Sequence, residues 1–193
     1  MYTLCDTSSI LMLIRIAPDM FIDDRYECCT IRLVREEIFR TQKFKTKYPW
    51  RIKFKNKIQC LPTNHVKNDN FDMYFDAVES LIEHGTINKE KGSEFDLSYV
   101  DKAIIACALS NAYKITTGDE DLRTFAKQEF GTHFKGWISP LGLINKWIRN
   151  NLIQWDDSLH DYVSEWTRDD EHPQPRRQKT AFKKLTGRKY PGS

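Results

Sequence analysis

The segment from Leu97 to Asn111, LSYVDKAIIACALSN, constrains the fold more than any other part of this sequence. A helix formed here would be apolar almost all the way round, and such a helix belongs in the protein interior. Asp101 breaks the pattern, because apolar residues lie one helical turn away on either side, at Leu97 and at Ile105. An unpaired buried carboxylate is costly, so this position calls for a specific counterpart.

Strands and helices are expected to alternate over the first 145 residues. A short strand leads into a helix that Pro18 ends, which is typical of the first half of a βα unit. Strands separated by helices favour a parallel sheet with helices on both faces, so we predict an α/β fold. The expected strands are 2–5, 113–117 and 137–138, and the expected helices are 8–18, 30–41, 71–84, 97–111 and 120–130.

Composition divides the chain into three parts. Residues 1–145 form the expected α/β domain, 146–170 a helical extension and 171–193 a basic tail. The tail carries seven basic residues and no acid from Arg176 onward, whereas the first 175 residues carry 23 basic and 27 acidic residues. Because DDEHPQP at 169–175 is typical of a linker, we expect a flexible cationic arm that binds RNA, or else a solubilising or partner-binding tail.

Three tryptophans accompany the extension. We expect them to pack a C-terminal helical segment, although aromatic residues are also enriched at protein interfaces. They are Trp147, Trp155 and Trp166.

The apolar and cysteine patterns exclude several classes of protein. Arg15 interrupts the longest apolar run near the start, so neither a signal peptide nor a membrane-spanning helix is expected. The five cysteines are odd in number and lack C-x-x-C spacing, which favours reduced packing thiols over disulfides or a zinc site. We therefore expect a cytoplasmic protein that does not contact membranes.

A basic and aromatic segment lies between Lys43 and Lys57. Its seven basic residues alternate with aromatic ones, and this period of two predicts a strand or ribbon. Cations can neutralise phosphates while aromatic faces stack on unpaired bases, so the segment is a candidate RNA-binding surface. A two-faced strand with aromatics in the core and lysines in water remains the alternative. The candidate RNA-binding residues are Lys43, Lys45, Lys47, Trp50, Arg51, Lys53 and Lys55.

Carboxylates follow the expected strands at one edge of the sheet. Asp6 comes directly after the first strand, Asp119 follows the strand ending at Thr117, and Asp101 begins a helix at the same edge. Like charges at close range raise one another's pKa, and a divalent cation removes that penalty. Hard oxygen ligands suit Mg²⁺ or Mn²⁺. Taken singly, however, each of these acids is also a reasonable helix cap or turn residue.

A fourth acid comes from Glu36 or Glu37. Helical geometry places Glu37 at the border of the apolar face, one turn from Leu33 and Val34. It directs Glu36 nearly opposite to that face. Glu37 is therefore the better ligand candidate. Glu36 is expected to be solvated and paired with Arg32 or Arg40.

Four segments together resemble the PIN domain, in particular the VapC-type toxin ribonucleases. They are LCDTSS at 4–9, REEIF at 35–39, DKAIIACAL at 101–109 and TTGDEDL at 116–122, within a resemblance that covers about residues 1–145. The resemblance implies that Asp6, Glu37, Asp101 and Asp119 form an acidic metal-binding quartet. It also implies that Asp121 is a fifth acid and that Thr117 orients the site.

The resemblance further implies a Mg²⁺- or Mn²⁺-dependent endoribonuclease, the toxin of a toxin–antitoxin or defence system. RNA would be its substrate, and a protein antitoxin and a second copy of the chain would be its partners. Scattered histidines argue against histidine acid–base cleavage. Two other functions stay open: an RNA- or protein-binding module that no longer cleaves, and a DNA-directed nuclease of the same fold.

Overall fold

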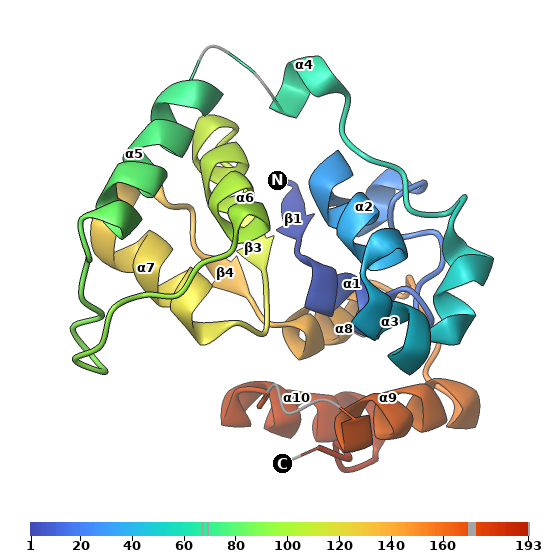
Figure 1. The fold of residues 1–193 in the computed structure, drawn as a ribbon. Coiled ribbons are helices and arrows are strands. Elements are labelled where there is room, and N and C mark those ends of the chain that lie inside the picture. Colours follow the sequence, from blue (N-terminus) through green and yellow to red (C-terminus); the bar gives the residue numbers. More distant parts are fainter. Residues whose placement is uncertain (67, 69, 170–172, 193) are drawn as a thin grey trace.

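A four-stranded parallel sheet forms the centre of the protein (Figure 1). The computed structural model describes residues 1–66, 68, 70–169 and 173–192. The sheet order is β2–β1–β3–β4, and every neighbouring pair is parallel. This confirms the expected α/β class with a parallel sheet, while a PIN-like arrangement stays a prediction. The strands are β1 (Thr3–Cys5), β2 (Cys28–Cys29), β3 (Lys114–Thr116) and β4 (Trp137–Ile138).

Helices make up most of the remaining described chain. The central helix α6 packs against β3, α5 and α7, whereas α1 packs against α2 and α8. The α-helices are α1 (Thr7–Leu13), α2 (Arg32–Arg40), α3 (Gln42–Lys47), α4 (Thr63–Val66), α5 (Phe71–Glu83), α6 (Tyr99–Ser110), α7 (Glu120–Phe130), α8 (Pro140–Arg149), α9 (Asp157–Asp169) and α10 (Arg176–Thr186). The 3₁₀ helices of the described residues are η1 (Asp24–Tyr26), η2 (Pro49–Phe54) and η3 (Gly131–His133).

The core is built around α6, as its sequence predicts. Seven consecutive residues, 103–109, are buried, so this helix is covered on every side. Burying each of the larger side chains, Ile104, Ile105 and Leu109, contributes about 1.5–3 kcal/mol, which makes α6 a main source of stability. Asp101 lies in its first turn, where the helix begins at the edge of the core.

The basic segment is helical, so the prediction of a strand or ribbon is wrong. Residues 42–47 form α3 and residues 49–54 form η2, with Pro49 at the first position of η2. The aromatic residues explain this outcome, because Phe44 and Tyr48 are four apart, as are Trp50 and Phe54. That spacing puts each pair on one side of a helical turn and against the core.

The basic tail folds as helix α10, which contradicts the expected flexible arm. Phe182 is completely buried and contacts the rings of Trp155 and Tyr190 edge-on. Apolar burial therefore orders a segment whose charge alone suggested disorder. Gly187 ends the helix in a left-handed conformation, with φ of 73°.

The expected division of the chain differs from the observed elements. Helix α8 spans 140–149 and so crosses the predicted boundary at 145, and α10 packs against it. Within the predicted linker 169–175, residues 170–172 lie outside the described residues. Gln174 is buried and accepts a hydrogen bond from the backbone nitrogen of Leu141. The second half of the predicted linker therefore packs against the folded domain through Gln174.

Candidate functional site

Asp6 connects the sheet to the first helix. It follows β1 directly and caps α1, where its Oδ1 accepts a hydrogen bond of 2.7 Å from the backbone nitrogen of Ser9. The hydroxyls of Ser8 and Thr117 also contact this carboxylate. Burial raises the pKa of Asp6, and these hydrogen bonds oppose the rise. The local sequence thus holds a carboxylate in the interior at the end of a central strand.

Asp101 forms a capping box with Ser98 at the start of α6. Its Oδ2 accepts hydrogen bonds from the backbone nitrogen and the hydroxyl of Ser98, at 3.0 and 2.6 Å. Burial raises the pKa of Asp101 to about 6, against the effect of these hydrogen bonds. The charges of Asp119 and Asp6 raise it further, which shows that the three carboxylates are electrostatic neighbours.

Asp119 caps α7 just beyond β3. Its Oδ1 accepts hydrogen bonds from the backbone nitrogens of Asp121 and Leu122, at 2.8 and 3.1 Å. Its own backbone nitrogen donates to Thr117 Oγ1 at 2.8 Å. Because Thr117 also contacts Asp6, this fully buried threonine links the ends of β1 and β3.

Glu37 reaches the same region from α2. Its Oε2 accepts a hydrogen bond from the hydroxyl of Thr7, which joins α2 to the start of α1. Glu36 pairs with Arg32 at 2.9 Å and Arg40 at 3.3 Å, as its position on the helix predicted. The two neighbouring acids therefore have separate surroundings.

Asp121 points to a different set of partners. Its Oδ1 accepts hydrogen bonds from Lys91 at 2.7 Å and from Asn88 at 3.3 Å. It is not among the residues that line the cavity described next. The predicted role of this fifth acid has no support in the observed contacts.

The four remaining acids line one cavity of about 310 Å³. Carboxylates that follow β1, lie on α2 and α6, and cap α7 thus line one cavity although they are up to 113 positions apart. Two lysines of α3 also line it and supply opposite charge. The lining residues are Asp6, Thr7, Ser8, Leu11, Glu37, Lys43, Phe44, Lys47, Tyr48, Ser98, Asp101, Asp119 and Trp166.

The capping hydrogen bonds of Asp101 and Asp119 use only one oxygen of each carboxylate. Among the described residues, the hydrogen bonds of Asp101 go to Oδ2 and the side-chain hydrogen bonds of Asp119 go to Oδ1, so each retains a second oxygen. Such hard, fixed oxygens fit Mg²⁺ or Mn²⁺. In the observed conformation, however, no three His, Cys, Asp or Glu side chains of the described chain form a metal-binding group. Binding would therefore draw the carboxylates together.

The candidate RNA-binding residues separate into two kinds. Arg51 is buried, and its guanidinium donates to the carbonyls of Ile38 and Tyr48 at 2.9 and 3.1 Å, so it supports the fold. Trp50 is half-buried against the guanidinium of Arg15. Lys43 and Lys47 line the cavity, and three further lysines are exposed: Lys45, Lys53 and Lys55.

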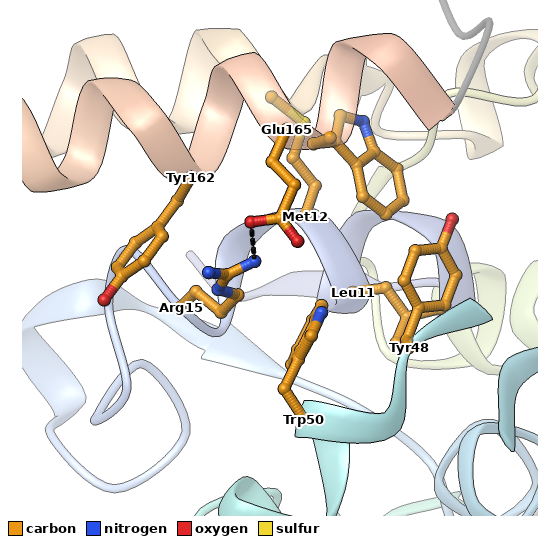
Figure 2. Close-up of a pocket in the computed structure, with 8 residues that line it drawn as sticks. Leu11, Met12, Arg15, Tyr48, Trp50, Tyr162 and Glu165 are labelled. Carbon is orange, nitrogen blue, oxygen red and sulfur yellow. Dashed lines mark hydrogen bonds and ion pairs between the residues drawn. The ribbon is translucent and has the colours of Figure 1, made fainter. Parts of the chain in front are cut away.

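Helix α9 closes one side of the cavity. Trp166 is buried and stacks on Tyr48 with ring centroids 5.6 Å apart, and both line the cavity. Figure 2 shows how α9 is held, with Arg15 between Trp50 and Tyr162 and joined to Glu165. The lining residues that were not predicted from the sequence are Thr7, Ser8, Leu11, Phe44, Tyr48, Ser98 and Trp166. Only the aromatic pattern of the extension hinted at Trp166.

Comparison with models of known protein families, with curated proteins and with solved structures gives no match. Across the described residues, no helix combines the length and apolarity needed to cross a membrane.

Proposed function

We propose that this protein is a Mg²⁺- or Mn²⁺-dependent ribonuclease that hydrolyses RNA phosphodiester bonds in the acidic cavity. The observation that carries the proposal is the convergence of Asp6, Glu37, Asp101 and Asp119 on one cavity beyond the ends of β1 and β3. Open parallel sheets place their active sites at this edge. The resemblance to PIN-domain ribonucleases adds the choice of RNA as substrate.

Each side chain has a defined task in this proposal. Asp6, Asp101 and Asp119 would hold the cation, because their caps orient them and their mutual repulsion favours a positive ion. The cation would polarise the scissile phosphate and lower the pKa of a bound water. Thr7 holds Glu37 beside this group as an assisting acid.

The lysines of α3 provide the complementary charge for the substrate. Lys43 and Lys47 line the same cavity as the carboxylates, so a phosphate held beside a cation would also lie near these ammonium groups. Such contacts supply affinity without sequence preference. The cavity volume of about 310 Å³ limits entry to a small part of an RNA chain.

Cleavage assays with matched variants test the proposal. Mn²⁺ should promote cleavage of a labelled RNA, and Asp101→Asn should reduce the rate by at least a hundredfold while the protein stays folded by circular dichroism. Asp161→Asn on α9 is the control, because Asp161 is exposed and does not line the cavity. Cleavage that persists in Asp101→Asn would exclude this mechanism. A DNA of the same sequence tests the alternative nuclease, and growth arrest on expression tests the toxin role.

A non-catalytic RNA-binding module is the second candidate. It is favoured by the capping roles of all three aspartates and by the lack of a closed metal-binding group in the described chain. This function predicts RNA binding without cleavage at any Mn²⁺ concentration. Isothermal titration with Mn²⁺ separates the two candidates, because only the nuclease requires the cation to bind at Asp101.

A further inference from the structure

A second surface feature runs along α2, apart from the acidic cavity. Two adjoining hollows of about 780 and 600 Å³ share residues of α2 and of the segment 61–63. The first lies between α2 and residues 55–63, and the second extends from α2 to α5 and α6. We call this continuous depression the α2 trough. Its shared lining residues are Arg32, Glu36, Arg40, Leu61 and Thr63.

One half of the α2 trough carries excess positive charge. Within the part of the chain that the structure describes, four basic residues line the first hollow and Glu36 is its only acid. The side chains of Arg32 and Arg40 share the Glu36 carboxylate yet stay 82% and 75% exposed. Exposed guanidinium groups of this kind are suited to bind phosphate. The remaining two basic residues are Arg35 and Lys55.

Aromatic side chains line the other half of the α2 trough. Tyr99 is 60% exposed, and its ring meets Phe75 with centroids 5.3 Å apart. Phe75 in turn stacks on Phe71 at 5.9 Å, and all three rings line the second hollow. Of these three rings Tyr99 is the exposed one, whereas Phe71 is buried and Phe75 is half-buried, so Tyr99 is the ring available for stacking. Cations at one end and aromatics at the other are the combination that binds unpaired nucleic acid.

We infer that the α2 trough binds an unpaired strand of RNA, with phosphates at Arg32 and Arg40 and a base against Tyr99. This inference deepens the proposed function, on which its choice of RNA rests. Two helices connect the trough to the acidic cavity, since α2 carries both Glu36 and Glu37 and α6 carries both Tyr99 and Asp101. The trough would thus hold a flanking part of the strand that enters the cavity.

Fluorescence anisotropy of the full chain with a labelled oligouridine RNA tests this inference. The measurement is made with EDTA present, so that binding is recorded without cleavage. Arg32→Ala/Arg40→Ala should lower the slope of log Kd against log salt by about 1.4, as expected for the loss of two phosphate contacts to a single strand. The matched control Lys127→Ala/Arg149→Ala removes equal charge from exposed residues outside the trough and should leave the slope unchanged.

The aromatic half is tested separately. Tyr99→Ala should weaken binding by at least about fivefold, as base stacking contributes, whereas Tyr99→Phe should bind like the wild type. Equal affinity and slope in the trough and control variants would overturn the inference. Displacement of the RNA by oligoglutamate at lower concentration than by unlabelled RNA would also overturn it, and would identify an acidic protein segment as the occupant.

The outcomes are distinguishable from those for the proposed function. A diuridine substrate should be too short to occupy the acidic cavity and the trough together, so its Mn²⁺-dependent cleavage would report on the cavity alone. If diuridine is cleaved normally and the trough substitutions do not change RNA binding, the trough inference is excluded and the proposed nuclease activity stands. If the trough variants lose RNA binding and the wild type cleaves no RNA, the trough inference stands and the proposed nuclease activity is excluded.

Discussion

Arg15, just beyond the end of α1, donates a hydrogen bond of 2.8 Å to Glu165 on α9, across 150 positions of sequence. The same guanidinium lies 3.9 Å from the ring centre of Tyr162 and 5.0 Å from that of Trp50. One cation therefore joins the turn after α1 to η2 and α9. This contact holds α9 in the position where Trp166 closes the cavity.

Replacing Arg15 should loosen α9. We expect Arg15→Ala to lower the free energy of unfolding by about 1–2 kcal/mol, because it removes a partly exposed ion pair and two cation–π contacts. Urea unfolding followed by tryptophan fluorescence measures the change. Arg15→Lys keeps the charge but loses the planar stacking, and it should fall between the alanine variant and the wild type. An unchanged midpoint in Arg15→Ala would show that α9 is held by apolar contacts alone.

The raised pKa of Asp101 predicts a pH-dependent stability. Its pKa is about 6 in the folded protein and near 3.8 in the unfolded chain, so the folded state binds more protons between these values. Stability should therefore fall as pH rises from about 4 to 6, by on the order of 2 kcal/mol. Asp101→Asn should remove this loss and be more stable than the wild type at pH 7 without divalent cations. Parallel melting curves from pH 4 to 7 in both proteins would contradict this.

The burial of Phe182 predicts that α10 contributes to global stability. Phe182→Ala should cost about 3–5 kcal/mol, because it leaves a cavity between α10 and Trp155. Lys183→Ala is the control, since this neighbour is exposed and should change stability by less than about 0.5 kcal/mol. Denaturation in urea measures both variants. If both lose little, α10 does not unfold cooperatively with the rest of the chain.

Arg51 should matter for folding and not for RNA. Arg51→Met removes the donors to the carbonyls of Ile38 and Tyr48, and each unsatisfied buried group costs about 1–3 kcal/mol. The folded fraction should bind RNA with wild-type affinity. Lys53→Met, at an exposed position of η2, should leave stability unchanged. A large loss of RNA affinity in a folded Arg51→Met variant would restore its role as a phosphate contact.

Local patterns predicted the α/β class of the fold and the four acids of the cavity, but not most of its other lining residues. The burial of α6 follows from the apolar pattern of that helix alone. The different surroundings of Glu36 and Glu37 likewise follow from their positions on one helix. The position of Asp6 and Asp119 after parallel strands follows from sheet geometry. The capping interpretation of the aspartates is confirmed, since Asp6, Asp101 and Asp119 each bond at the start of a helix. They also line one cavity, whereas their role as metal ligands stays a prediction.

Long-range packing explains what the sequence could not predict. Strand β2 has only two residues and pairs with β1 through Cys28 and Cys29, which is too short for a periodic signal. The basic segment follows its aromatic spacing rather than its alternating charge. In the tail, the burial of Phe182 depends on the packing of α10 against α8 and on the ring of Trp155, and the composition of the tail does not indicate these contacts.

The closure of the cavity by Trp166 of α9 affects when the site forms during synthesis. The four carboxylates lie between positions 6 and 119, whereas α9 spans 157–169. A growing polypeptide on the ribosome therefore exposes all four acids before their enclosure is complete. The cavity acquires its final shape only after α9 has left the exit tunnel, which delays assembly of the site relative to translation of its acids.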